Sequence, residues 1–198
     1  MFVFYLREET IMIIGITVHE IIVNECIAQG IDYEEMYKII RELLIRFNAG
    51  KAFAKRMGIK WLNNMSKKVP YRTKFLQMVA EPWKYSKREI KSFAWKVACE
   101  KWYSEKSALV LDQMKAFVDE GDVLARIIDS VYMKGANTKK SNLAMQLELD
   151  MGHTKCFLVK KDAIVLYGLL IWKYCKRRDK EDKANGIIDA NGELIMIG

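Results

Sequence analysis

Apolar residues recur at helical spacing along most of the chain and predict a mainly α-helical fold. Between Thr17 and Gly30, and again between Asp32 and Gly50, they stand three and four positions apart and share one face of a helix. Thr17 and Asp32 each precede a glutamate by three residues, which is the spacing of a capping box at a helix N-terminus. We therefore predict two helices that end at Gly30 and near Gly50, because glycine favours termination.

The same periodicity continues in the second half of the chain. Ser86 and Glu89 form a third candidate capping box, which opens a helical pattern that extends through Tyr103. Gly121 is expected to end one of the later helices, and Asp162 to cap the last of them. These later helices are predicted over residues 105–120, 122–134, 142–150 and 163–177. The predicted fold class is a mainly α, compact multi-helix domain of about seven helices.

Short β-hairpins are predicted near the N- and C-termini, where the pattern changes. The apolar stretches concerned are residues 2–6 and 11–16 at one end, and residues 187–189 and 193–197 at the other. The second pair flanks Asn191 and Gly192, a dipeptide that favours the tight turn of a hairpin. A further short strand is predicted over residues 156–159.

A polar stretch, residues 136–142, is the nearest feature to an internal boundary. We expect a helical core domain over residues 1–135, which contains a basic segment at 51–96. A C-terminal subdomain of helix plus hairpin, residues 136–198, is expected to pack on the same core.

Composition points to a folded protein that needs no covalent staple. Of its 198 residues, 51% are hydrophobic and 29% are charged, a balance typical of globular proteins. The 4 cysteines form no CxxC pair and are interpreted as free, buried thiols in a reducing compartment, which predicts a cytoplasmic location. No secretory signal is recognisable. The longest apolar run, residues 163–172, is about half as long as a bilayer-spanning helix, so no membrane partner is expected.

Positive charge is concentrated in one segment. The formal net charge is +8, yet residues 51–96 alone contain 13 lysines and arginines and only 2 glutamates. Aromatic residues alternate with these cations. Ammonium and guanidinium groups neutralise phosphates, and exposed rings can stack on unpaired bases. Nucleic acid is therefore the predicted partner, DNA more than RNA, although rings at helical spacing are expected to pack mostly inward.

The predicted nucleic-acid-binding residues are the polar members of this segment. They are Lys51, Lys55, Arg56, Lys60, Asn63, Asn64, Lys67, Lys68, Arg72, Lys74, Lys84, Lys87, Arg88 and Lys91. Residues 51–68 partly resemble a helix-turn-helix, with Gly58 at the turn and Phe53 at a packing position. The second half departs from that motif, because Asn64 and Lys67 stand where a recognition helix buries apolar residues.

Signatures of catalysis are missing from the sequence. There is no P-loop, no GxGxxG after a strand, no HExxH and no GxSxG. His153, Cys156 and Cys175 could begin a zinc site, but a fourth ligand is not evident. The residues near 173–183 are basic and follow an apolar run, yet acidic residues interspersed among them argue against a membrane surface. We expect no cofactor and no enzymatic activity, with a nuclease of dispersed carboxylates as the remaining enzymatic alternative.

Three functions are open on these grounds. The first is a non-enzymatic nucleic-acid-binding protein, such as a phage or mobile-element regulator or a replication accessory factor. The second is a virion, assembly or nucleocapsid protein, which would form a homo-oligomer. The third is a small inhibitor that binds a host protein.

Overall fold

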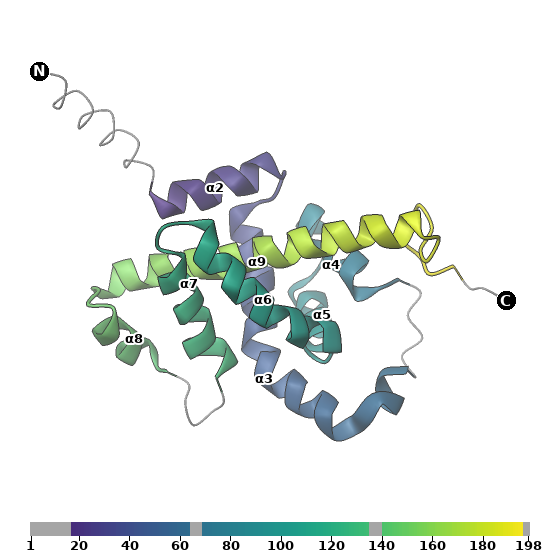
Figure 1. The fold of residues 1–198 in the computed structure, drawn as a ribbon, viewed down its shortest axis with the longest axis horizontal. Helices are drawn as coiled ribbons and strands as arrows, with labels where there is room; N and C mark the ends of the chain where they lie inside the picture. The colour runs from purple at the N-terminus through teal and green to yellow at the C-terminus, as the bar shows by residue number, and fades with distance from the viewer. Residues whose placement is uncertain (1–16, 64–68, 135–139, 196–198) are drawn as a thin grey trace, which may run out of the picture.

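The computed structural model describes residues 17–63, 69–134 and 140–195, with the backbone alone for residues 57–63 and Asn142. These residues form eight α-helices and no β-sheet (Figure 1), which confirms the mainly α-helical class. The helices are α2 (Val18–Ala28), α3 (Tyr33–Asn63), α4 (Tyr71–Ala80), α5 (Lys87–Ala98), α6 (Lys101–Phe117), α7 (Gly121–Ile128), α8 (Asn142–Glu148) and α9 (His153–Ala184). One 3-10 turn, η1 (Pro82–Lys84), precedes α5, and one π-helical turn, η2 (Asp129–Met133), follows α7.

Helix α9 runs through the middle of the molecule, and the other helices pack around it (Figure 1). It contacts α2, α3, α4, α6 and α7, and every residue from Ala163 to Trp172 is buried. A helix that is apolar on all sides is stable only when other helices surround it. At Gly168 the approach of α3 is so close that a Cβ atom would lie 2.3 Å from Cγ1 of Ile40. In the described part of the chain, no helix is both long and apolar enough to cross a membrane.

Two predictions for the start of α9 are wrong. Residues 156–159, predicted as a strand, lie in the first turns of this helix. Asp162 does not cap a helix but lies inside α9, where the Tyr33 hydroxyl donates to its Oδ1 at 2.5 Å. A polar residue before an apolar run looks the same at a cap and inside a longer helix whose first turns are exposed.

Helix α3 contains the largest departure from prediction. The end of α2 at Gly30 is confirmed, and Gly30 has the positive φ of 68° that favours glycine there. At Gly50, by contrast, α3 continues without interruption to Asn63. A Cβ atom on Gly50 would lie 2.6 Å from the carbonyl carbon of Ala98, so this glycine permits a close helix crossing rather than an end.

The helix-turn-helix interpretation is also wrong, because its turn is absent. The backbone of α3 is helical through Gly58, where the motif requires the first helix to stop. A continuous helix cannot place a second helix across the first at that point.

The capping residues that the sequence predicts at three helix N-termini are confirmed. Both directions of the capping box are formed at Thr17 and at Ser86, as predicted. At Asp32 the side chain accepts a hydrogen bond from the backbone N–H of Glu35 at 2.8 Å.

The boundaries between later helices differ from the predicted ones. The helix that opens at Ser86 ends at Ala98, and α6 starts at Lys101. Gly121 begins α7 instead of ending α6. A Cβ atom at this position would lie 2.0 Å from the carbonyl oxygen of Met114, so the glycine permits a close approach to the last turn of α6. The predicted helix 142–150 corresponds to α8.

The predicted hairpins are not seen among the described residues. Near the C-terminus one isolated antiparallel bridge joins Ile188 and Leu194, with Gly192 at a φ of 81° between them. The N-terminal hairpin, residues 2–6 and 11–16, lies outside the described residues, as do residues 196–198. All four cysteines are free and buried, as the sequence predicts.

Candidate nucleic-acid interface

The predicted nucleic-acid-binding residues lie on four different elements. Those with described side chains are Lys51, Lys55 and Arg56 on α3, Arg72 and Lys74 on α4, Lys84 on η1, and Lys87, Arg88 and Lys91 on α5. Lys60 and Asn63 lie in the last turns of α3, where the backbone alone is described. Asn64, Lys67 and Lys68 lie outside the described residues.

Helices α3 and α5 pack directly against each other, which brings their basic residues together. The crossing at Gly50 and Ala98 fixes one part of this contact, and the rings of Phe53 and Trp95 lie 5.6 Å apart beside it. The apolar side of α5 is buried: Ile90, Phe93, Ala94, Val97 and Ala98. Its charged side chains therefore point outward, next to those of α3.

A groove of about 410 Å³ separates α3 from η1 and the first turns of α5. Four cations line it: Lys38, Arg41, Lys87 and Lys91. Two tyrosines, Tyr37 and Tyr85, and two glutamates, Glu35 and Glu42, also line it. The glutamates already have cationic partners within α3, because Glu35 binds Lys38 at 2.6 Å and Glu42 binds Arg46. The groove is therefore positively charged overall.

The remaining cations of the groove have no carboxylate partner. Among the described residues, Arg41, Lys87 and Lys91 have no acidic oxygen within 4.0 Å, and the same holds for Arg88 on the outer side of α5. Burial raises the pKa of the Tyr85 hydroxyl, so this phenol stays neutral and can donate a hydrogen bond to an anion.

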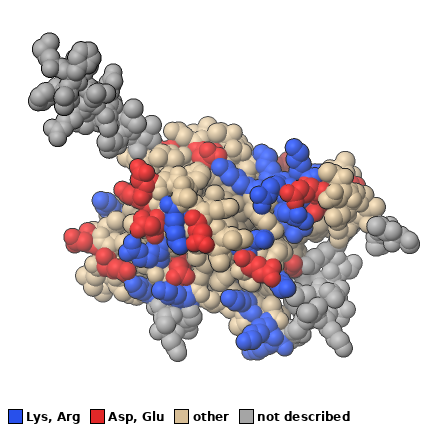
Figure 2. Space-filling model, viewed as in Figure 1, with Lys and Arg blue, Asp and Glu red and all other residues tan. Residues whose placement is uncertain are grey.

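Unpaired cations continue along the exposed side of α3. Lys51 lies over the ring of Phe47 at 5.9 Å, and within the described part of the chain neither Lys55 nor Arg56 forms an ion pair. From Arg41 to Lys55 the helix rises by about 21 Å in roughly four turns, so both residues point to a similar side. Blue side chains gather over the lower part of α3 in Figure 2.

We call these eight residues the α3–α5 basic surface. They are Lys38, Arg41, Lys51, Lys55, Arg56, Lys87, Arg88 and Lys91. The distance of about 21 Å from Arg41 to Lys55 along α3 matches the length of about six nucleotides of one strand, whose phosphates are spaced by about 3.4 Å.

Lys84 and Lys74 lie close to carboxylates. Lys84 binds Glu81 at 2.7 Å across η1. Hydrogen bonds from the backbone and side chain of Ser86 hold the pKa of Glu89 below its ordinary value, and the charge of Lys74 contributes a smaller effect in the same direction. These two lysines therefore add less net positive charge than the residues of the α3–α5 basic surface.

Arg72 faces a different part of the molecule. Its Nη2 donates to Oδ2 of the buried Asp182 at 2.8 Å, and its guanidinium lies 6.0 Å from the ring centre of Trp102. Beside it, the Thr73 hydroxyl donates to Asp179 at 2.7 Å. The structure thus places Arg72 between α4 and α9, where it holds the two helices together.

Sequence reasoning missed three residues of this region. Lys38 and Arg41 precede the basic segment, in a stretch that is rich in glutamate, so composition did not single them out. The available signal was the helical periodicity, which places both residues away from the apolar face of α3. Trp83 is one of the aromatic residues of the basic segment, which were expected to pack mostly inward, yet 76% of it is exposed.

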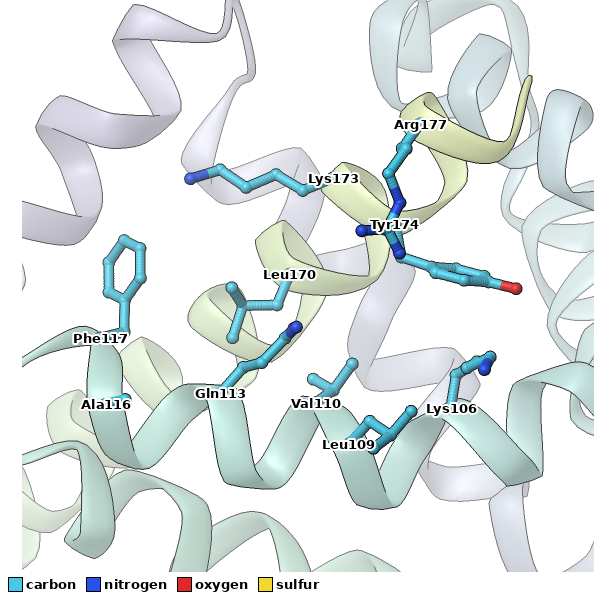
Figure 3. A pocket seen from close by; sticks show the side chains of 10 residues that line it. All are labelled: Lys106, Leu109, Val110, Gln113, Ala116, Phe117, Leu170, Lys173, Tyr174 and Arg177. Atoms are coloured by element: carbon cyan, nitrogen blue, oxygen red, sulfur yellow. The ribbon is translucent and has the colours of Figure 1, made fainter. Parts of the chain in front are cut away.

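A second hollow, of about 530 Å³, lies between α6 and α9 and is drawn in Figure 3. Its floor is apolar, with Leu109, Val110, Phe117 and Leu170. Its cations are engaged: Lys173 binds Glu25 at 2.8 Å, while Lys106 and Arg177 both lie about 6 Å from the ring of Tyr174. Blue and red side chains alternate over the C-terminal half of α9 in Figure 2. This hollow is less suited to phosphate than the α3–α5 basic surface.

His19 and Asp162 form a further polar cluster between α2 and α9. Nδ1 of His19 lies 2.8 Å from Oδ1 of Asp162, and the Tyr33 hydroxyl donates to the same oxygen. Burial and the neighbouring Asp162 raise the pKa of Tyr33, so its proton remains in the hydrogen bond. The cluster satisfies a buried carboxylate, which is a structural role.

Among the described side chains, there is no group of three or more His, Cys, Asp and Glu residues that could hold a metal ion. Comparisons with protein-family models, with curated proteins and with solved structures found no match to this chain.

Proposed function

We propose that this protein is a non-enzymatic nucleic-acid-binding protein that contacts phosphates through the α3–α5 basic surface. The observation that carries the proposal is the set of exposed cations on two adjacent helices, of which all but Lys38 lack a carboxylate partner among the described residues. Self-repulsion among unpaired cations costs free energy in the free protein, and a polyanion relieves it. Counterion release from the nucleic acid adds to the affinity.

The alternative site for a polyanion is the hollow between α6 and α9. Its cations stack on aromatic rings or bind carboxylates, so a phosphate would have to displace partners they already have. A cytoplasmic location is part of the proposal, because four free, buried thiols suit a reducing compartment.

A salt titration tests the proposal. Affinity for a fluorescent strand of about 20 nucleotides and for the matching duplex would be measured by anisotropy. The NaCl concentration would run from about 50 to about 300 mM, a range over which counterion release changes affinity strongly. With about six of the eight cations in contact with phosphates, we expect a slope of log K against log salt near −4 for a single strand and near −5 for a duplex. No binding at low salt, or a slope near zero for both, would overturn the proposal.

Charge removal locates the interface. One variant replaces Arg41, Lys55, Lys87 and Lys91 with Gln, and its matched control replaces Lys106, Lys155, Lys176 and Lys180, on α6 and α9, with Gln. Both lose four positive charges from exposed or half-buried helix positions. We expect the first variant alone to lose affinity, by at least about 100-fold in low salt. Equal losses would mean that net charge, and no particular surface, governs binding.

A structural or assembly role is the second candidate, and exposed apolar side chains favour it. Leu143 and Leu147, one turn apart on α8, are 65% and 75% exposed, and Phe157 on the adjacent part of α9 is 52% exposed. Apolar groups gathered in this way are typical of contact surfaces between chains. Light scattering over a concentration series distinguishes the two: assembly should weaken on Leu147→Ser with Phe157→Ser, whereas a monomer at all concentrations argues against this role.

A further inference from the structure

Trp83 is the most exposed large apolar side chain in the described part of the chain. Its exposed fraction is 76%, whereas tryptophan is usually highly buried in folded proteins. None of the other described aromatic residues of the basic segment is exposed: Tyr71, Phe75 and Phe93 are buried, and Phe53, Tyr85 and Trp95 are half-buried. The exposure of Trp83 therefore calls for a partner that covers the indole.

The backbone holds this indole on a short, well-bonded element. Trp83 is the middle residue of η1, whose buried Pro82 anchors the turn. The N–H of Lys84 donates to the carbonyl of Glu81 at 3.0 Å, and the N–H of Tyr85 donates to that of Pro82 at 3.1 Å. The turn that carries the ring is thus fixed, so its backbone does not need to be ordered at the moment of binding.

The surroundings of Trp83 join the α3–α5 basic surface. A hollow of about 350 Å³ is lined by Trp83, Tyr85, Pro82, Asp32 and Glu35. Three of these residues also line the groove that contains Lys87 and Lys91. The indole therefore stands at the end of a row of cations.

A carboxylate that has no cationic partner among the described residues lies beside the indole. Asp32 lines the hollow next to Trp83 and accepts the N–H of Glu35, whereas Glu35 binds Lys38. Phosphates are repelled from that side and attracted toward Lys87 and Lys91. A strand that follows the cations can reach Trp83 only with a base, which is uncharged.

We propose that the ligand is single-stranded nucleic acid, which stacks an unpaired base on Trp83 while its phosphates follow the α3–α5 basic surface. This inference rests on the proposed function and adds the class of strand. Stacking on an exposed ring requires a base whose face is free, which a continuous duplex does not offer. Either DNA or RNA supplies such a base.

The test compares Trp83→Ala with the unaltered protein on a single strand and on a blunt duplex. Loss of one stacked base lowers single-strand affinity by about 5- to 150-fold, and duplex affinity should change less than about 2-fold. Trp83→Phe should recover most of the loss, because a smaller ring still stacks. Ile27→Ala, which removes an exposed apolar side chain from α2, is the matched control and should leave both affinities unchanged.

Two results separate this inference from the proposed function. If both ligands bind with a steep salt dependence and Trp83→Ala alters neither affinity, the stacking inference is wrong and the basic surface stands. If neither ligand binds at low salt, the proposed function itself fails. Oligo(dT) and oligo(rU) of equal length identify the strand: equal affinity indicates stacking and phosphate contacts alone, and a preference for oligo(rU) indicates contacts to the 2′-hydroxyl.

Discussion

Replacement of Gly50 by Ala should loosen the contact between α3 and α5 on which the basic surface depends. The added Cβ atom would lie 2.6 Å from both the carbonyl carbon and the Cβ of Ala98, and 2.7 Å from its carbonyl oxygen. Backbone atoms cannot rotate away as a long side chain can, so the two helices must separate.

The expected size of the effect is the balance of two terms. Overpacking of a close contact costs about 1–3 kcal/mol, and the better helix propensity of alanine returns up to about 1 kcal/mol. With two backbone atoms in the clash, the cost lies toward the upper end of that range. We expect a net loss of about 1–2 kcal/mol in the free energy of unfolding and a fall in Tm of about 2–8 °C.

Urea unfolding followed by circular dichroism measures the change. Gly152→Ala is the control, because open space surrounds that position and φ there is −60°. It should cost under about 1 kcal/mol, the usual effect at an N-cap. Adding Ala98→Gly should not restore stability, since the clash with the carbonyl group remains. A Gly50→Ala protein as stable as the parent would refute the close crossing.

Three further predictions concern caps, thiols and an ion pair. Ser86→Ala should cost about 0.5–2 kcal/mol. The backbone N–H of Ser86, which lowers the pKa of Glu89 most, is kept in this variant, so only the contribution of the hydroxyl to that pKa is lost. This part of the stability difference should be full above pH 4.5 and shrink as the pH falls below it, which urea unfolding at pH 3 and 7 checks. A difference that grows in acid would contradict the cap. The four cysteines should resist a coloured thiol reagent at pH 8 until the protein unfolds, because they are buried and burial raises the pKa of Cys26 to about 11. A rapid change in the absorbance of the reagent with the native protein would contradict this. Arg72→Gln should lower stability by about 1–3 kcal/mol because it leaves Asp182 with Arg178 alone, yet it should not change the salt slope of binding.

Features determined by near neighbours could be predicted from the sequence. The caps at Thr17 and Ser86 depend on a residue three positions away, and the end of α2 depends on Gly30 itself. Helical periodicity likewise identified the buried face of the first half of α3, because a helix core face follows directly from spacing.

Features determined by distant neighbours could not. Gly50 permits contact with Ala98, and Asp162 is satisfied by His19 and Tyr33, residues far from it in the chain. A glycine that ends a helix and one that admits another helix are the same letter in a sequence. Periodicity alone therefore divided α3 at the wrong place.

The same distinction applies to the candidate interface. Composition found the basic segment, but it could not tell Arg72, which binds Asp182, from Lys91, which has no carboxylate partner among the described residues. Nor could it add Arg41, because Arg41 lies outside residues 51–96, in a part of the chain with more acidic than basic residues. The groove exists only once α5 lies on α3.

The most direct test of the central claim is the difference in salt slope between the α3–α5 variant and its charge-matched control. Each phosphate contact contributes about 0.7 to the slope for a single strand, so removing Arg41, Lys55, Lys87 and Lys91 should make it shallower by about 3. The control on α6 and α9 should keep the slope of the unaltered protein. A control slope that falls as far as that of the α3–α5 variant would contradict the claim that this surface binds nucleic acid.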